Sequence, residues 1–259
     1  MFTPERQFTK DKLRVEIYPN REAMGKAAAA AAISKIREVL TEKDEVNVVF
    51  AAAPSQNEFQ EALTSADGIP WERIRAFHLD EYLGLPSDAP QRFSVFLDEH
   101  VFKKVNFREV HYLRGDCPSP EAEAERYADL LRKYPLDFAF IGIGENGHIA
   151  FNDPPVADFE DPFLVKIVTL DERCRMQQVN DGCFESIDLV PTQALTLTIP
   201  AIMSARFIYC MVPGTTKTEA VKETIEGDIG THCPASILRR HDAAILYLDR
   251  DAAGLLSAE

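Results

Sequence analysis

The stretch of residues 136–155 reads LDFAFIGIGENGHIAFNDPP, an apolar run followed by a glycine-rich loop. Its first part, up to residue 141, is mostly apolar and predicts a buried parallel strand. Gly142 and Gly144 follow directly, where glycines let the backbone turn sharply and come close to a ligand. The loop then presents His148 between the amide of Asn146 and the carboxylate of Asp153. Because ligands of open α/β sheets bind beyond the carboxyl ends of strands, this pattern favours a proton-transferring histidine over a structural one.

Apolar runs that predict strands alternate with amphipathic runs that predict helices along the rest of the chain. Strands are expected at residues 13–18, 46–51, 74–79, 110–113, 136–141, 165–170, 194–199, 207–212 and 243–248. Helices are expected from a cap at Asn20 to about 42, from about 57, over 91–102, from a cap at Ser119 to about 134, from about 171, after 217 to about 226, and over 234–240. This β-α repeat predicts an α/β fold, with a mostly parallel sheet and helices on both faces. No linker or repeat divides the sequence, so residues 1–259 are expected to form a single domain.

The composition describes an ordinary globular protein with an acidic surface. Of the 259 residues, 46% are hydrophobic and 27% are charged, and the formal net charge is -14. Such a charge repels nucleic acid and anionic membranes, so neither is an expected partner. An anionic substrate would need lysine or arginine close to its binding site.

Cysteine usage and the chain's N-terminus indicate a cytoplasmic protein. The count of cysteines is odd and no Cys-x-x-Cys occurs, which favours free thiols in a reducing compartment and gives little support to a zinc site. Residues 1–6 lack the apolar core of a signal peptide, and no apolar stretch is long enough to span a bilayer. The cysteines are Cys117, Cys174, Cys183, Cys210 and Cys233.

Two acidic residues, Asp80 and Glu81, follow the third predicted strand. Such a pair can bind a metal, act as a base, or cap a helix. The residues that come next, Tyr82-Leu83-Gly84-Leu85-Pro86, predict a loop rather than an immediate helix, which makes capping less probable. A partly desolvated carboxylate is a suitable base for a carbon acid beside a carbonyl.

Two cations follow later strands. Lys217 comes after a Gly-Thr-Thr loop at the start of a helix, where backbone N–H groups, hydroxyls and an ammonium together suit a phosphate. Arg173 lies in the first turn of another predicted helix, where a cation opposes the helix dipole and an anionic partner would explain it. The alternatives are a solvated surface lysine and a surface ion pair of the arginine.

Three motifs of the chain, taken in order, resemble the glucosamine-6-phosphate deaminase (isomerase) family. They are LDEYLGL at residues 79–85, GIGENGHIAFN at 142–152 and VPTQALT at 190–196. The resemblance implies a Rossmann-like fold and an isomerisation of an aldose to a ketose, coupled to loss of ammonia, with no cofactor and no metal. The implied substrate is glucosamine 6-phosphate or a close relative, and a homo-oligomer is compatible with it.

The resemblance also implies the roles of the catalytic residues. Asp80 matches the base that moves a proton between C2 and C1. His148 matches the residue that opens the sugar ring by proton transfer at the ring oxygen. Asp153 stands where the family usually has a glutamate that assists this histidine, and Asn146 stands where some members have aspartate. Because a neutral amide cannot stabilise an imidazolium as a carboxylate does, Asp153 or Glu145 is expected to supply the charge support.

The expected substrate contacts come from several loops. Lys217 matches a phosphate contact, and Arg173 lies in the helix that supplies the family's phosphate-binding arginine. The family's glycine- and threonine-rich phosphate loop is replaced here by residues 51–56, AAAPSQ, in which Ser55 is the candidate contact. The full set of expected substrate contacts is Ser55, Glu81, Gly144, Gly147, Arg173 and Lys217.

Two other functions compete with the deaminase. The related 6-phosphogluconolactonases typically have arginine where Tyr82 stands and threonine where Ile149 stands, so both positions favour the deaminase. A non-catalytic sugar-phosphate sensor of this fold usually carries a DNA-binding segment, which this acidic sequence does not show. The presence of Asp80 and His148 also argues for catalysis.

Overall fold

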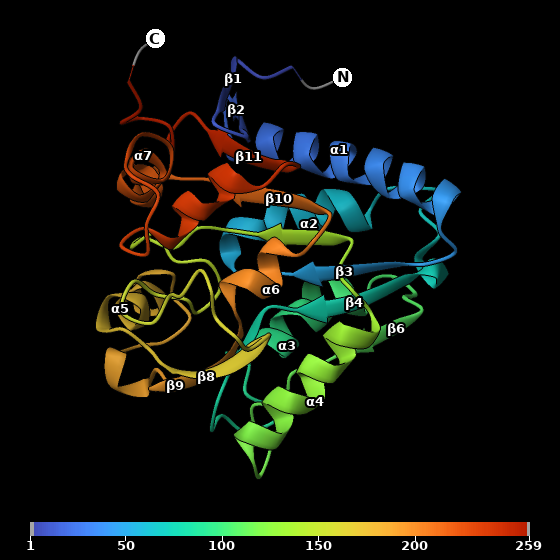
Figure 1. The fold of residues 1–259 in the computed structure, drawn as a ribbon, viewed down its shortest axis with the longest axis vertical. Helices are drawn as coiled ribbons and strands as arrows, with labels where there is room; N and C mark the ends of the chain where they lie inside the picture. Colours follow the sequence, from blue (N-terminus) through green and yellow to red (C-terminus); the bar gives the residue numbers. More distant parts are fainter. Residues whose placement is uncertain (1–2, 258–259) are drawn as a thin grey trace.

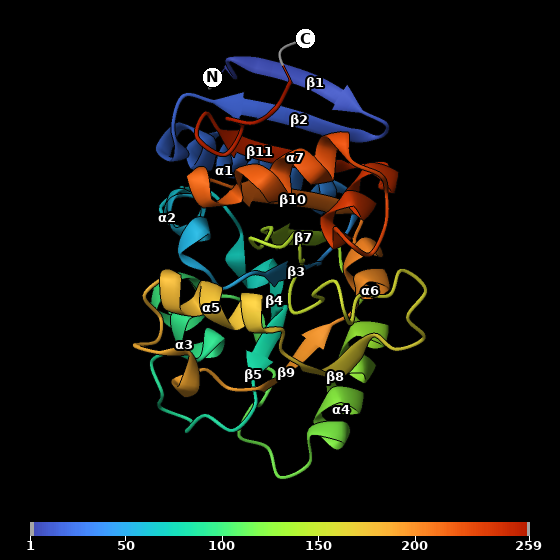
Figure 2. The same ribbon diagram turned by 90° about the vertical axis from the view of Figure 1, so that its left-hand side faces the viewer.

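An eight-stranded sheet forms the body of the computed structural model, which describes residues 3–257. Its strand order is β1-β2-β11-β10-β7-β3-β4-β6, and Figure 2 shows most of these strands stacked from top to bottom. Every neighbouring pair is parallel except β1 and β2, so the predicted mostly parallel sheet is confirmed. The bounds are β1 Arg6–Lys10, β2 Leu13–Tyr18, β3 Val46–Phe50, β4 Ile74–His78, β6 Glu109–His111, β7 Phe138–Ile141, β10 Phe207–Val212 and β11 Ala244–Asp249.

Helices cover both faces of this sheet, as predicted (Figures 1 and 2). One face packs against α1 (Arg21–Glu42), α2 (Asn57–Thr64) and α3 (Phe93–Leu97). The other packs against α4 (Pro120–Lys133), α6 (Ile199–Met203) and α7 (Thr218–Glu226). Successive strand residues serve opposite faces: in β3, Val48 and Phe50 join the first core and Val49 joins the second.

The predicted helix starts are confirmed where a side chain caps them. The Asn20 carboxamide accepts a hydrogen bond from the Ala23 N–H (2.9 Å) at the start of α1, and Ser119 caps α4 in the same way. The predicted helix 91–102 is divided into α3 and a π-helical turn, η3 (Asp98–Phe102). Short 3₁₀ turns occur at η1 Pro54–Gln56, η2 Trp71–Arg73, η4 Ile187–Leu189, η5 Thr215–Lys217 and η6 Pro234–Arg240.

A second, antiparallel sheet of order β5-β9-β8 lies beside the parallel one, in the lower half of Figure 2. Its strands are β5 Asp80–Tyr82, β8 Val165–Thr169 and β9 Gln193–Leu197. The predicted strands 165–170 and 194–199 therefore exist but belong to this sheet. The second one also ends earlier than predicted, because Thr198 caps α6 and Ile199 is already helical. Short apolar strands look alike in parallel and antiparallel sheets, so their partner was not predictable.

The ends of the chain bear on several sequence predictions. β1 was not predicted, because it is an edge strand without buried residues. Residues 1 and 2 of the segment 1–6 lie outside the described residues. The predicted domain 1–259 also includes residues 258 and 259, which lie outside them as well. Between residues 3 and 257, no helix has both the length and the apolar composition needed to cross a bilayer.

Candidate active site

A cavity of about 320 Å³ lies at the carboxyl ends of the parallel strands. The segments that follow β3, β4, β7 and β10 line it, together with residues of α5 (Glu172–Asn180). Gln177 of α5 accepts a hydrogen bond from the Glu145 N–H (2.9 Å), which ties this helix to the loop after β7. The predicted site residues that line the cavity are Ser55, Asp80, Gly144, His148 and Lys217.

Asp80 reaches the cavity from the junction between the two sheets. It follows β4 after a single residue, Leu79, and opens β5, where it pairs with Thr196 of β9. Its side chain is buried, and this burial raises the pKa of the carboxyl well above its ordinary value, with further contributions from the charges of Glu81 and Asp153. A carboxylate with a raised pKa holds a proton more strongly, which suits a group that must remove one from carbon.

His148 is oriented by two acceptors on its own loop. Its Nδ1 lies 2.7 Å from Oδ1 of Asn146 and 3.0 Å from Oδ1 of Asp153. Both acceptors require a proton on Nδ1, so Nε2 of the neutral ring is left as the acceptor. The Asn146 amide also donates to Asp153 Oδ1 (2.9 Å), and its oxygen accepts from the His148 N–H. Asn146 and Asp153 therefore support the ring and do not line the cavity themselves.

The two glycines predicted as substrate contacts have different places. Gly144 lines the cavity directly beside the imidazole, because a Cβ at this position would lie 2.1 Å from Cε1 of His148. Gly147 does not line it. This residue has a φ of +82°, and a Cβ there would lie 2.7 Å from Sγ of Cys233. Gly147 thus lets the loop turn against the core, which is a structural role rather than a contact with substrate.

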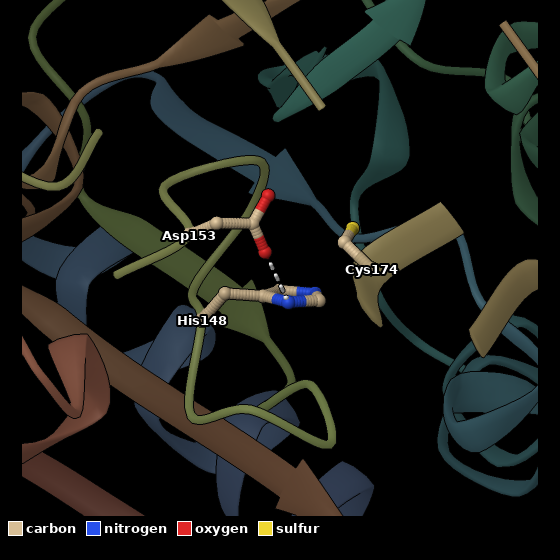
Figure 3. A group of neighbouring side chains, drawn as sticks. All are labelled: His148, Asp153 and Cys174. Atoms are coloured by element: carbon tan, nitrogen blue, oxygen red, sulfur yellow. Dashed lines mark ion pairs between the residues drawn. The ribbon is translucent and has the colours of Figure 1, made fainter. Parts of the chain in front are cut away.

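Asp153 and Cys174 are buried neighbours of the histidine, and Figure 3 shows the Asp153 carboxylate facing the ring while Cys174 comes from a separate segment. Burial would raise the pKa of Asp153, but hydrogen bonds and charge from His148, with help from Asn146 and Cys174, lower it below the ordinary value. Asp153 therefore remains charged and can stabilise an imidazolium. The thiol of Cys174 has a pKa well above its ordinary value because it is buried beside this carboxylate.

The same three side chains offer a potential metal-ligand set. One nitrogen of His148, one oxygen of Asp153 and the sulfur of Cys174 lie within 4.8 Å of one another. A metal would need the thiolate, which burial disfavours, and would need Asp153 to exchange its hydrogen bonds for coordination. The arrangement fits a hydrogen-bonded support for His148 better than a metal centre.

Lys217 supplies a positive charge to the cavity wall. It ends the η5 turn that leads into α7, and Thr215 and Thr216 beside it also line the cavity. Only 5% of Lys217 is exposed, and no residue between 3 and 257 forms an ion pair or hydrogen bond with its ammonium. Burial lowers the pKa of Lys217, and the charges of Asp181 and Glu145 only partly offset this. A buried ammonium without a partner, at a helix N-terminus, favours an anionic ligand.

Ser55 lies on the η1 turn, which leads into α2. Its Oγ accepts a hydrogen bond from Nε2 of Gln56 (3.2 Å), which also donates to the Met211 carbonyl (3.1 Å). Gln56 thereby joins the turn after β3 to the carboxyl end of strand β10. Ser55 is thereby held at the cavity with its hydroxyl proton available to a ligand oxygen.

Glu81 is placed differently from the prediction. It is fully buried and does not line the cavity. Its carboxylate accepts hydrogen bonds from the N–H groups of Phe93 (3.1 Å) and Ser94 (3.0 Å), and it lies 3.5 Å from Arg92. Glu81 therefore caps α3 from a distant strand. The structure thus gives Glu81 the capping role, which the sequence had made the less favoured interpretation.

Arg173 also lies outside the cavity lining. Its side chain is 60% exposed and lies 3.7 Å from Glu219, which is the surface ion pair considered as an alternative. The arginine that does line the cavity is Arg21, the first residue of α1. The argument applied to Arg173, that a cation in the first turn of a helix opposes the dipole, applies equally to Arg21 and could have found it.

Comparison with known sequences identifies a single family over most of the chain. Residues 19–247 match the family described as glucosamine-6-phosphate isomerases/6-phosphogluconolactonase. A glucosamine-6-phosphate deaminase of Exiguobacterium sibiricum is 38% identical over 195 residues, which cover 74% of this chain and 75% of the relative. One of Listeria monocytogenes is 35% identical over 212 residues, covering 82% and 88%.

Solved structures agree with this assignment. A monomeric glucosamine-6-phosphate deaminase superposes with a TM-score of 0.84 at 31% identity, covering 93% of this chain and 99% of that one. A 6-phosphogluconolactonase of Thermotoga maritima has a TM-score of 0.75 at 22% identity, covering 92% and 100%, and at that identity it shows the shared fold alone. Motifs, fold and relatives thus agree, and the chain belongs to the glucosamine-6-phosphate isomerase/6-phosphogluconolactonase family.

Proposed function

We propose that this protein is a deaminase that converts glucosamine 6-phosphate, or a close relative, and water to fructose 6-phosphate and ammonia. The observation that carries the proposal is one cavity lined by a buried carboxylate, an oriented imidazole and a buried ammonium that has no carboxylate partner among residues 3–257: Asp80, His148 and Lys217. The relatives named glucosamine-6-phosphate deaminase support this choice of substrate.

The phosphate is assigned to the part of the cavity formed by η5 and η1. Lys217 supplies a charge there, and the hydroxyls of Ser55, Thr215 and Thr216 supply donors. The loop before η5 is fixed, because the Gly214 N–H donates to Asp249 Oδ1 (3.0 Å). Gly214 has a φ of +93°, which glycine adopts without strain. This preorganised site would hold the phosphate while the sugar extends towards Asp80 and His148.

His148 is assigned to ring opening. The cyclic hemiacetal must lose the proton of its O1 hydroxyl and gain one on the ring oxygen before the C1 aldehyde exists. With Nδ1 protonated, Nε2 can accept the first proton and return it to the ring oxygen. Asp153 stabilises the imidazolium that forms between these two steps.

Asp80 is assigned to the proton transfer between carbons. Its carboxylate removes the proton from C2 of the open-chain amino aldehyde, which the C1 carbonyl acidifies, and O1 gains a proton, so that an enolamine forms. Return of the first proton to C1, with loss of a proton from nitrogen, gives a 2-imine. Water then adds to C2 and ammonia is eliminated, which produces the 2-ketone. Each step is a proton transfer, an addition to a carbon–nitrogen double bond or the elimination of ammonia, and this sequence of steps requires no metal or redox cofactor.

Product analysis tests the proposal against the alternatives. The purified protein is incubated with glucosamine 6-phosphate, galactosamine 6-phosphate and 6-phosphogluconolactone, and ammonia and acid release are followed. Ammonia from an amino sugar phosphate, unaffected by EDTA, is expected. Acid release from the lactone without ammonia from either sugar would support a lactonase instead. The position where lactonases typically have arginine holds Tyr82. This tyrosine is buried in an aromatic cluster, where its ring centroid lies 4.8 Å from that of Phe93.

Three broader properties stay predictions from the sequence: a single domain, a cytoplasmic location and a homo-oligomer. The solved deaminase named above is described as monomeric. Light scattering on the purified protein would decide the oligomeric state.

A further inference from the structure

Arg21 extends into the cavity from a helix that the sequence analysis did not connect with the site. It is the first residue of α1, which follows β2, and its side chain is 45% exposed. The lining of the cavity that Arg21 enters also includes Pro54 and Ser55 of η1, Gly214 and Lys217. The Arg21 guanidinium donates to the Pro54 carbonyl (2.9 Å), so it lies against the η1 turn, one of the two segments to which the phosphate has been assigned.

The guanidinium is held in a fixed orientation. Its Nε donates to Oε1 of Glu58 (2.5 Å), and its Nη2 donates to Oε2 of Glu58 (2.9 Å) and to the Pro54 carbonyl (2.9 Å). Between residues 3 and 257, no hydrogen bond is formed by Nη1. The Nε and Nη2 edge of the guanidinium is therefore bound by the protein, while Nη1 has N–H donors left for a ligand.

The close approach of α1 and α2 produces this geometry. At Gly25, one turn after Arg21, a Cβ would lie 2.7 Å from Cβ of Glu58 and 2.8 Å from the backbone nitrogen of Phe59. Only glycine allows the two helices to approach this closely. The crossing brings Glu58, in the first turn of α2, against Arg21, and α2 in turn follows the η1 turn that carries Ser55.

We propose that Arg21 is the second cation for the phosphate of the substrate, in the role that the sequence suggested for Arg173. This inference rests on the proposed function of the cavity. A phosphate monoester is largely dianionic at neutral pH, and the chain has a net charge of -14, so a single ammonium leaves the anion undercompensated. A guanidinium offers several N–H donors to phosphate oxygens, which complements the point charge of Lys217.

The alternative is that Arg21 only connects α1 to α2 through Glu58. Three variants separate the two roles: Arg21→Ala removes the cation and the connection, Glu58→Gln weakens the connection but keeps the cation, and Arg173→Ala removes a cation outside the cavity. The probe is inorganic phosphate, whose dissociation constant is measured by isothermal titration calorimetry on the full chain. Circular dichroism checks each fold, and Arg21→Gln replaces Arg21→Ala if the latter unfolds.

Arg21→Ala is expected to weaken phosphate binding by about five- to tenfold. This loss is smaller than the loss of a fully buried charge-assisted contact would be, because the guanidinium is half-exposed. Glu58→Gln should bind phosphate at least as tightly as the parent, since it removes a competing negative charge, and Arg173→Ala should not change it. Unchanged binding in Arg21→Ala, or equal weakening in Arg21→Ala and Glu58→Gln, would overturn the proposal.

The binding measurement also separates this inference from the proposed function. If phosphate binding depends on Arg21 but no amino sugar phosphate releases ammonia, the deaminase proposal fails and the anion site remains. If ammonia is released with the same KM in the parent and Arg21→Ala, the deaminase stands and the role of Arg21 is wrong.

Discussion

Nδ1 of His148 lies 3.0 Å from Oδ1 of Asp153, so this aspartate reaches the ring although it is one methylene shorter than the glutamate implied by the family resemblance. The loop itself makes the contact possible, because Val156 and Ala157 donate their N–H groups to the Asp153 carbonyl in a turn. Asn146 joins the same two side chains and completes a small network. The two departures from the family pattern thus occur together in one hydrogen-bonded unit.

This unit leads to a prediction about ring opening. His148→Gln should reduce turnover of the predominantly cyclic substrate and have a much smaller effect on an analogue held in the open-chain form, because that analogue does not need the imidazole for opening. Asp153→Asn should show the same pattern more weakly. Steady-state rates on both substrates provide the test. Equal losses on the two substrates would place His148 in the isomerisation step or assign it a purely structural role.

Asp80→Asn should abolish turnover while binding remains. A positioned base contributes roughly 10²–10⁴-fold to rate, and the amide cannot accept the C2 proton. Ammonia release measures the loss, and titration with inorganic phosphate checks that the anion site is intact. Wild-type turnover in this variant would show that another group removes the proton.

The same substitution should stabilise the protein at neutral pH. The native pKa of Asp80 is raised above the ordinary value of 3.8, so the native state binds the proton more strongly than the unfolded chain does. The stability that this group contributes is fully present below about pH 3.8 and is lost as the pH rises through the native pKa. Asn has no such loss. Thermal unfolding should give Asp80→Asn a higher Tm than the parent at pH 7, with the difference shrinking towards pH 3.8. A Tm difference that does not depend on pH would contradict this assignment of the raised pKa.

Lys217→Met should raise KM for the phosphorylated sugar. The variant keeps an unbranched apolar side chain, one atom shorter, but removes the charge, and a charge-assisted contact is worth about 1.5–3 kcal/mol, or roughly ten- to hundredfold in affinity. Because the ammonium is buried without an ion pair among residues 3–257, its removal should not lower Tm. Arg173→Ala, at an exposed cation, is the matched control and should leave KM unchanged.

Glu81→Gln should destabilise the fold rather than remove a substrate contact. The carboxylate is fully buried, accepts hydrogen bonds from Phe93 and Ser94, and balances the charge of Arg92. Loss of its charge leaves the buried guanidinium with the partly exposed Asp116 (3.3 Å) as its remaining ionic partner and weakens the charge-assisted contacts of Glu81, which costs about 1.5–3 kcal/mol. Denaturant unfolding should show this loss, while KM of the remaining folded enzyme should change little. A raised KM without loss of stability would return Glu81 to the binding site.

The sequence predicted the parts of the site that depend only on local order along the chain. Asp80, His148 and Lys217 each follow a recognisable strand, and the carboxyl ends of parallel strands meet at one edge of a sheet, so their grouping was predictable. Glu81 was assigned incorrectly because the helix it caps begins at Phe93, well beyond the loop that follows it.

Other features depend on contacts between distant segments. The partner of β8 is β9, yet their apolar patterns would suit a parallel sheet equally well. Arg21 reaches the cavity only because α1 and α2 cross closely at Gly25, and the sequence does not show which helices cross. Helix capping at Asn20 and Ser119, in contrast, involves residues within one turn and was predicted correctly.

The place of β11 in the parallel sheet has a consequence for biosynthesis. Among the strands of residues 3–257, β11 leaves the ribosome last, yet it lies between β2, one of the first, and β10. Until residues 244–249 emerge, β2 and β10 each have an open edge, and the nascent chain can complete neither the sheet nor the cavity that its edge supports. A premature stop shortly before Ala244 therefore removes an interior strand rather than a dispensable tail. In such a product two strand edges would present unpaired backbone N–H and C=O groups to chaperones and proteases, so it would not be a slightly shortened enzyme.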